Sequence, residues 1–273
     1  SPEQYEPFIL ISLLLSLALI PILLTKRKAP KFRKLGYIDI KGLYKTSPLG
    51  TVSMFCTGIT HSALFSLGAV YAASMNFTIF EISLFLFSIS IAGALFQWPI
   101  GYFSDRSDRR MIMIACTFLA TLFCFLAVSS SQTSLENMYL ASSVGMDKIM
   151  FFVFVVLYAG FALPSFTLNL AYGNDFISKE KFVAAGAGLQ IIFGIGAMGG
   201  PILCSVFMNF YGPNGFFIYL GFFHIIIGLF GMYRITKRSY TDNPGSTFTP
   251  LPRNITPLGI ELDPTTAADL SNS

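Results

Sequence analysis

The chain contains 273 residues, of which 53% are hydrophobic and only 12% are charged, with a mean hydropathy of +0.64. Such a composition excludes an ordinary water-soluble globular protein and indicates an integral protein of a lipid bilayer. The 18 basic and 14 acidic residues leave a net charge of +4, and the few histidines and cysteines show no metal-binding spacing. Without such a cluster or a phosphate-binding glycine loop, the sequence predicts no enzyme activity and no bound cofactor, metal or nucleic acid.

Seven apolar runs, each long enough to cross a bilayer as a helix, follow one another along the chain. They cover residues 8–25, 50–74, 80–103, 111–130, 149–172, 183–208 and 215–235. Because the runs are continuously apolar, they favour helices over the alternating strands of a membrane barrel. The predicted fold class is all-α, a polytopic helical membrane protein with seven transmembrane helices.

The first predicted helix, within residues 1–25, is separated from the others by a basic linker at residues 26–49. The linker holds eight basic residues and one acid, Asp39. It fits a solvated loop, and a second possibility is a short interfacial helix attracted by anionic lipid, which its apolar residues match only loosely. The other runs predict a six-helix bundle at residues 50–235 and, beyond it, a disordered tail at residues 236–273.

The basic residues predict how the chain crosses the membrane. Placing the N-terminus outside puts all of the 18 basic residues except Lys148 in the loops and tail on the cytoplasmic side. The sequence therefore predicts a multi-pass protein of the plasma membrane, the inner membrane in a bacterium, with a cytoplasmic C-terminus. Because the chain opens outside without an initiator Met or a signal peptide, we also expect a further segment before residue 1.

The loop after the third run, GYFSDRSDRR at residues 101–110, is dense in charge between two apolar runs. Asp105 lies just beyond the third run, at the depth where the sixth run begins, and a helix N-terminus stabilises a carboxylate. The arginines of the loop can pair with acids such as Asp108, Asp175 or Glu180 in the same and neighbouring loops. The general excess of positive charge in cytoplasmic loops would explain the same residues without any pairing.

The same loop resembles the cytoplasmic signature of the major facilitator superfamily, G-x-x-x-D-R-x-G-R-R. The matching residues are Gly101, Asp105, Arg106, Arg109 and Arg110. Asp108 stands where the family has its second glycine, so details that depend on a flexible residue there stay open. In that family the loop is a conformational latch that holds the cytoplasmic ends of the helices together. The resemblance implies this role for Asp105 and Arg109.

The sixth run contains GIGAMGGPIL, which resembles the G-x-x-x-G-P pattern in helix five of many antiporters of the same superfamily. The matching residues are Gly196, Gly200 and Pro201. Helix eleven is the counterpart of helix five in the second half of such proteins, so the sixth run would be helix eleven. Together with Gly194 and Gly199, these glycines predict a narrow face for close packing, and the proline predicts a kink. A generic tight helix interface remains the alternative.

The resemblance extends over nearly the whole chain and implies its place in the fold. The first run is similar to helix six, the linker to the loop between the halves, and the other runs to helices seven to twelve, so an N-terminal half would be missing. The segments SPLG and FQWPIGYFSDRSDRR, with the LDP of the tail, are similar to the YcaD-type subgroup. The family implies secondary active transport of a small solute by alternating access, with H+ or Na+ as a possible coupling ion.

Polar residues inside the runs are costly in lipid and are candidates for a substrate or proton site. The candidates are His61, Tyr71, Gln97, Asn169 and Gln190. His61 can exchange protons near neutral pH and lies about halfway along its run. Each of these side chains could instead bond the backbone of a neighbouring helix.

The remaining polar residues of the runs predict structural roles. His224 is expected to be structural, and Glu81 is expected at the outer interface. No Asp or Glu lies deep within a run, so a carboxylate proton carrier would belong to the missing half. The four cysteines fall within the runs and are interpreted as small apolar packing residues.

A seven-helix receptor is the alternative function that the sequence leaves open. Such receptors share the helix count, the orientation and an acid–arginine pair just after the third helix. Against this hypothesis, the loop continues as DRR, no paired extracellular cysteines are present, and the last run lacks an N-P-x-x-Y pattern.

Overall fold

The computed structural model describes residues 5–24, 40–140, 144–177 and 181–237, and within these ranges every regular element is a helix. Most of the basic linker and the predicted disordered tail lie outside the described residues. By contact density the chain divides into a unit at residues 1–35 and a larger unit at residues 36–273. The first unit contains α1 (Glu6–Leu23), an apolar helix with Pro21 inside it.

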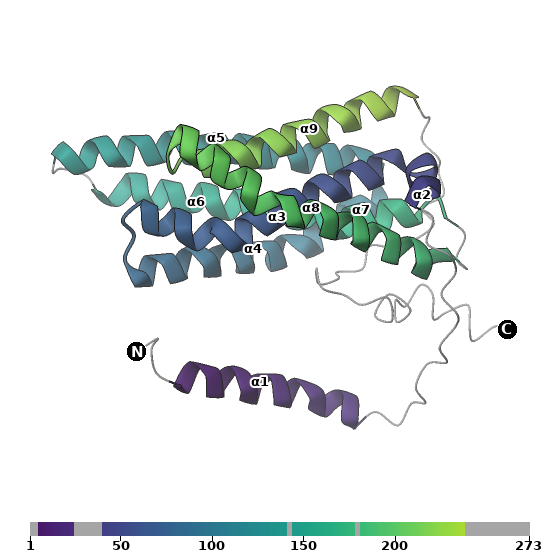
Figure 1. Ribbon diagram of the computed structural model, residues 1–273, viewed down its shortest axis with the longest axis horizontal. Helices are drawn as coiled ribbons and strands as arrows, with labels where there is room; N and C mark the ends of the chain where they lie inside the picture. Colours follow the sequence, from purple (N-terminus) through teal and green to yellow (C-terminus); the bar gives the residue numbers. More distant parts are fainter. Residues whose placement is uncertain (1–4, 25–39, 141–143, 178–180, 238–273) are drawn as a thin grey trace. The chain divides into compact units, whose positions relative to one another are not determined.

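The larger unit is a bundle of helices that run along one another (Figure 1). Its helices are α2 (Ile40–Thr46), α3 (Pro48–Ser74), α4 (Ile79–Arg106), α5 (Arg109–Leu140), α6 (Val144–Ala162), α7 (Ser165–Asn174), α8 (Phe182–Tyr211) and α9 (Gly215–Lys237). Helix α3 packs along α8, while α5 packs against both α6 and α9. The short helix α2 contacts α3 and α8.

Six segments of the described chain are long and apolar enough to cross a membrane. They are Pro48–Ser74, Ile79–Arg106, Arg109–Ser131, Asp147–Asn174, Phe182–Tyr211 and Gly215–Lys237. The prediction of an all-α, polytopic helical membrane protein is confirmed. The apolar stretch of α1, Glu6–Pro21, is shorter than these segments, so the predicted count of seven is approximate.

Local turn chemistry sets where the helices begin and end. Asn76 adopts a left-handed conformation, with φ of 56°, in the turn between α3 and α4, as Asn does more readily than most residues. The next helix starts with a capping box: Thr78 Oγ1 accepts from the backbone N–H of Glu81, whose carboxylate accepts from Thr78 N–H at 2.8 Å. Gly212, with φ of 64°, ends α8.

The prediction of one continuous helix over residues 149–172 needs a correction. The helix is interrupted after Ala162, and α7 begins at Ser165, with Pro164 between them. Proline cannot donate a backbone hydrogen bond and its ring obstructs the preceding turn, which accounts for the break. The two pieces together still supply one membrane span.

Apolar side chains fill the bundle interior and also cover its outside. The interior is rich in aromatic rings, and Tyr71 is a fully buried member that stacks on Phe216 with ring centroids 4.9 Å apart. On the outside, Trp98, Met198 and Phe210 are about three-quarters exposed. Such outward apolar residues are expected where the surrounding solvent is lipid.

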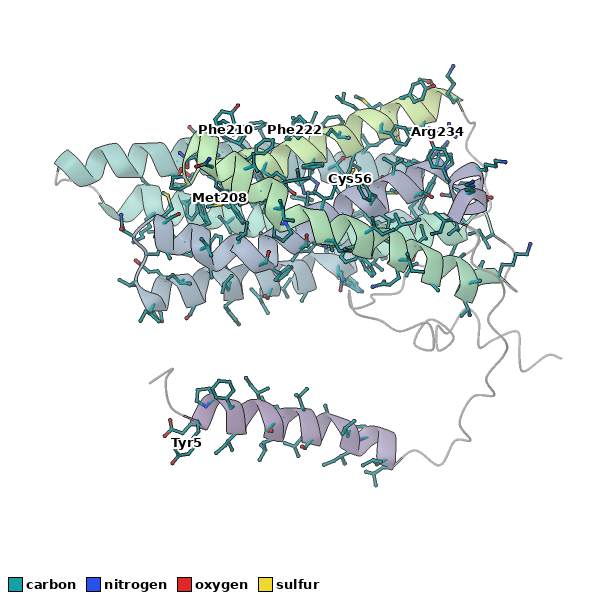
Figure 2. The ribbon with its side chains drawn as sticks, in the orientation of Figure 1. Tyr5, Cys56, Met208, Phe210, Phe222 and Arg234 are labelled. Carbon is teal, nitrogen blue, oxygen red and sulfur yellow. The ribbon has the colours of Figure 1, made fainter. Side chains whose placement is uncertain are left out.

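The charges of the described residues are unequally divided between the two ends of the bundle. One end holds Lys41, Lys45, Arg106, Arg109, Arg110, Lys181, Arg234 and Lys237. Figure 2 labels Arg234 at this end, and Figure 1 shows α2 at the same end. Lys148 lies at the other end, near the start of α6, where it pairs with Glu81. The end that holds the eight basic residues is called the basic end below.

Candidate functional site

Arg109 is the centre of a charged cluster at the basic end. Its guanidinium donates from Nη1 to both carboxylate oxygens of Asp175, at 2.8 and 3.0 Å, and from Nη2 to Asp105 Oδ1 at 2.9 Å. Its Nε donates to Ser104 Oγ at 3.1 Å. Although charged, the Arg109 side chain is only 5% exposed. The cluster therefore joins the end of α4, the start of α5 and the segment just after α7.

The α4–α5 junction positions Arg109 through a two-residue connection. Helix α4 ends at Arg106, Ser107 is extended, and α5 starts at Arg109. Asp108 accepts from the backbone N–H of Arg110 at 3.0 Å and from its Nη2 at 2.7 Å. A carboxylate before a helix satisfies unpaired N–H groups of the first turn. The residue that departs from the family's glycine thus supports the start of α5.

The structure brings only some of the predicted loop residues into the cluster. Asp105 and Arg109 bond each other, whereas Arg110 pairs with Asp108 instead. The Arg106 guanidinium lies over the Tyr102 ring, 3.6 Å from its centroid, and is exposed. Gly101 is buried within the last turns of α4. Of the acids that the sequence offered, Asp175 is the inter-segment partner of Arg109, and Glu180 lies outside the described residues.

A second group of polar side chains lies around the break between α6 and α7. Ala162 is the last residue of α6, so its carbonyl belongs to a helix end that lacks the usual donors. His61 Nε2 lies 3.3 Å from that carbonyl oxygen, and His61 is fully buried about halfway along α3. The ring of Phe193 on α8 packs edge-on against the imidazole at 6.1 Å. His61 therefore helps to satisfy the broken helix.

Two further hydrogen bonds tie α7 to its neighbours. Asn169 Nδ2 donates to Thr57 Oγ1 on α3 at 2.9 Å, and both residues are buried. Gln97 on α4 donates to Thr167 Oγ1 at 3.4 Å and is half-buried. Helix α7 is thus held by polar contacts to both α3 and α4. This polar group, comprising His61, Thr57, Gln97, Thr167 and Asn169, is called the α7 polar group below.

The other predicted polar residues lie apart from the α7 polar group. Tyr71 lies among aromatic rings ten residues further along α3, about 15 Å along the helix axis. Gln190 is half-exposed on α8. His224 is fully buried beside the Tyr158 ring, at a centroid distance of 5.8 Å. Cys56, Cys116, Cys124 and Cys204 are buried free thiols.

Helices α3 and α8 meet along a seam where backbone touches backbone. A Cβ built on any of three glycines would overlap a carbonyl group of the facing helix. The overlaps are Gly58 on Phe193, Gly196 on Phe55 and Gly200 on Ile59. Tyr219 on α9 closes the seam by donating to the Gly200 carbonyl at 2.9 Å. The predicted four-glycine face is therefore divided, because Gly194 and Gly199 border open space.

Sequence reasoning missed several residues of these groups. Thr57 and Thr167 were not singled out, since isolated threonines are common in membrane helices and their partners lie far away in sequence. Pro164 was the available signal for the α6–α7 break, because a proline inside an apolar run interrupts the helical hydrogen bonds. Ser104 could not be recognised as a member of the cluster from the sequence, because its role depends on the burial of Arg109.

The geometry describes a polytopic helical membrane protein with polar groups inside its spans, and comparisons with known proteins give its family. The model of the Major Facilitator Superfamily matches residues 50–265. The chain belongs to this superfamily. Membrane transport is the general function that this membership supports, and the receptor alternative is not favoured.

Similar curated proteins are described as uncharacterized MFS-type transporters. One from Yersinia enterocolitica is 24% identical over 76% of this chain and 50% of its own length. YcaD of Escherichia fergusonii is 22% identical over 86% of this chain and 56% of its own length. YfkF of Bacillus subtilis is 24% identical over 67% of this chain and 44% of its own length. The chain spans about half the length of these relatives, and no solved structure matches it significantly.

Proposed function

We propose that the protein is a secondary transporter that moves a small solute by alternating access, and that this chain supplies helices six to twelve of it. The family membership and the transporter names of the relatives support transport. The match to about half of each relative supports a partner half elsewhere in the same protein. The single observation that carries the proposed mechanism is the burial of Arg109 between carboxylates of two separate segments.

The proposed orientation places the basic end in the cytoplasm. Among the described residues, that end holds every basic side chain except Lys148. Positive residues concentrate on the cytoplasmic side because their translocation is disfavoured. In this orientation the chain starts outside and its C-terminus lies inside. The Arg109 cluster would then act at the cytoplasmic mouth of the transporter.

Arg109 acts in this proposal as a latch between segments that must separate or rotate. A charged hydrogen bond to each carboxylate is strong when water is excluded, and breaking one partner leaves a buried charge uncompensated. An intact cluster therefore stabilises the state in which the cytoplasmic ends of α4, α5 and α7 are together. A change in the cluster shifts the populations of the inward-open and outward-open states by the free energy that distinguishes them.

The α7 polar group is the proposed centre of solute binding in this half. Interrupted helices in transporters leave backbone groups available to a solute or ion near the middle of the membrane. His61 and Asn169 lie beside such an interruption, and Gln97 reaches it from α4. Gln190 and Tyr71 remain proposed contributors from α8 and the outer part of α3. His61 is the proposed proton-exchanging residue, with H+ or Na+ as the coupling ion.

The latch is tested by Asp105→Asn in the complete transporter, with Asp108→Asn as the matched control. Both changes remove one carboxylate charge within the same loop, but only Asp105 bonds Arg109. We expect Asp105→Asn to lower transport about tenfold or more and to shift the inward/outward population measured by double electron–electron resonance. Asp108→Asn should keep both properties within about twofold. Unchanged transport and populations in Asp105→Asn would reject the latch.

The solute is found by a thermal-shift screen of the complete transporter against sugars, organic acids, amino acids and drug-like cations. A stabilising compound is then tested with His61→Ala and with His224→Ala, a second buried histidine that lies outside the α7 polar group. We expect the stabilisation to disappear with His61→Ala and to persist with His224→Ala. Persistence in both variants would place the solute elsewhere.

A further inference from the structure

A groove of about 550 Å³ opens at the basic end between α2, α3 and α8. Its lining residues are Ile40, Lys41, Tyr44, Lys45, Thr51, Val52, Phe55, Ile192 and Ile195. Several of them, including Tyr44 and Ile195, are about half exposed, so the groove faces outward from the bundle. Its volume lies within the range of about 300–1,000 Å³ that is usual for small-molecule sites.

The wall of this groove is apolar. Ile40, Val52, Phe55, Ile192 and Ile195 contribute aliphatic and aromatic surface. Thr51 is the one threonine of the lining. Its hydroxyl donates a hydrogen bond to the Ser47 carbonyl at 2.9 Å, so this donor is already used. A ligand in the groove would therefore contact hydrocarbon along most of its length.

The mouth of the groove carries positive charge. Lys41 and Lys45 are four residues apart on α2 and therefore lie on the same side of that helix. Both are exposed, and neither forms an ion pair with any described residue. Leu43, by contrast, is 7% exposed and anchors α2 to the bundle. Helix α2 thus presents two ammonium groups beside an apolar groove.

We propose that this groove binds one anionic phospholipid, whose phosphate lies between Lys41 and Lys45 and whose acyl chain lies against α3 and α8. An apolar wall with a cationic mouth is complementary to an amphiphilic anion, and basic pockets between membrane helices bind anionic headgroups. Tyr44 adds an aromatic ring of the kind that lies at the level of lipid headgroups. The bilayer around the protein supplies such a lipid at high local concentration.

A lipid in this position would brace α2 against the α3–α8 seam. Phe55 lines the groove, and its carbonyl faces Gly196 in the seam. Ile192 and Ile195 lie on the adjoining turns of α8. A bound lipid would thus stabilise the same pair of helices from outside. This inference does not depend on the transported solute or on the latch.

The test is native mass spectrometry of the purified protein, titrated with phosphatidylglycerol and, separately, with phosphatidylethanolamine. We expect one tightly bound phosphatidylglycerol and a higher thermal midpoint, and at least tenfold weaker binding of phosphatidylethanolamine. The double variant Lys41→Gln/Lys45→Gln should bind phosphatidylglycerol about 25-fold more weakly, about fivefold per lysine. The matched control Arg234→Gln/Lys237→Gln removes two exposed or half-exposed cations at the same end and should change binding less than twofold.

A second pair of variants tests the groove rather than the charge. Ile195→Trp fills the groove, whereas Ile202→Trp changes another outward residue of α8 that does not line it. Only Ile195→Trp should abolish the bound lipid, with the lipid-free thermal midpoint of both variants unchanged. Equal weakening by the two charge variants, equal binding of both lipids, or an unaltered lipid in Ile195→Trp would each overturn the proposal. Displacement of the lipid by a transported solute would do the same.

Discussion

The two ends of the bundle use the same chemistry in opposite surroundings. At the basic end, Arg109 is 5% exposed and bonds Asp105 and Asp175. At the other end, Lys148 is 33% exposed and pairs with Glu81, which is 25% exposed. Both are contacts between a cation and a carboxylate, yet only the first excludes most of the water around the cation.

This difference in exposure changes how much each ion pair contributes to stability. Water and salt screen an exposed pair, so its net contribution to stability is small. A buried cation has lost its hydration and depends on its carboxylates, so the segments that carry them become linked. We therefore expect similar substitutions at the two ends to change the free energy of unfolding by different amounts.

The largest effect is expected from removing the buried cation. Arg109→Met leaves Asp105 and Asp175 close together without their common partner, and we expect it to destabilise the bundle by about 3–5 kcal/mol. The measurement is chemical unfolding in detergent. Arg106→Met, an exposed neighbour in the same loop, should cost less than about 1 kcal/mol. Equal losses in both variants would remove the distinction between buried and exposed charge.

An intermediate effect is expected from the capping box at the other end. Thr78→Ala removes the side-chain acceptor of the Glu81 backbone N–H and should destabilise the protein by about 1 kcal/mol. Ser83→Ala on the same helix removes a hydroxyl that bonds only the preceding turn, at Ile79, and should be nearly neutral. A neutral Thr78→Ala would show that this end needs no cap, and would widen the contrast between the ends.

The smallest effect is expected from the partly exposed pair of Lys148 and Glu81. Lys148→Met should change the free energy of unfolding by less than about 1 kcal/mol. Raising the salt concentration to about 1 M should make that variant and the parent protein equally stable, because the Debye length falls to about 3 Å. The cost of Arg109→Met should persist at the same salt concentration. A cost for Lys148→Met as large as that of Arg109→Met would break the comparison.

Much of the fold could be predicted from the sequence because membrane spans are a local property. Each of the six observed spans coincides with a predicted run, since about 20 apolar residues suffice to identify a span. The break at Pro164 was missed because the run is apolar on both sides of it, although the proline itself was visible. A narrow packing face on α8 could be expected from Gly196 and Gly200, but not that α3 packs against it or that Gly58 takes part.

The site was less predictable because its contacts join distant parts of the chain. The sequence analysis named Asp108, Asp175 and Glu180 as possible ion-pair partners of the loop arginines, without an order of preference. Of these three, Arg109 bonds Asp175, which is 66 residues away in sequence. This pairing depends on the end of α7 lying beside α5. Asn169 and its partner Thr57 are 112 residues apart. Such pairings follow from packing, which a single sequence does not report.

The glycine seam restricts how α3 and α8 can move relative to each other. Because Gly58, Gly196 and Gly200 have no side chains, backbone atoms of α3 and α8 meet directly at these three positions. Advancing α8 by one residue along its own screw would set Ile195 or Ala197 against the Phe55 carbonyl, where even a methyl group does not fit. These contacts oppose sliding of one helix along the other, so we expect α3 and α8 to move together as one unit in any conformational change.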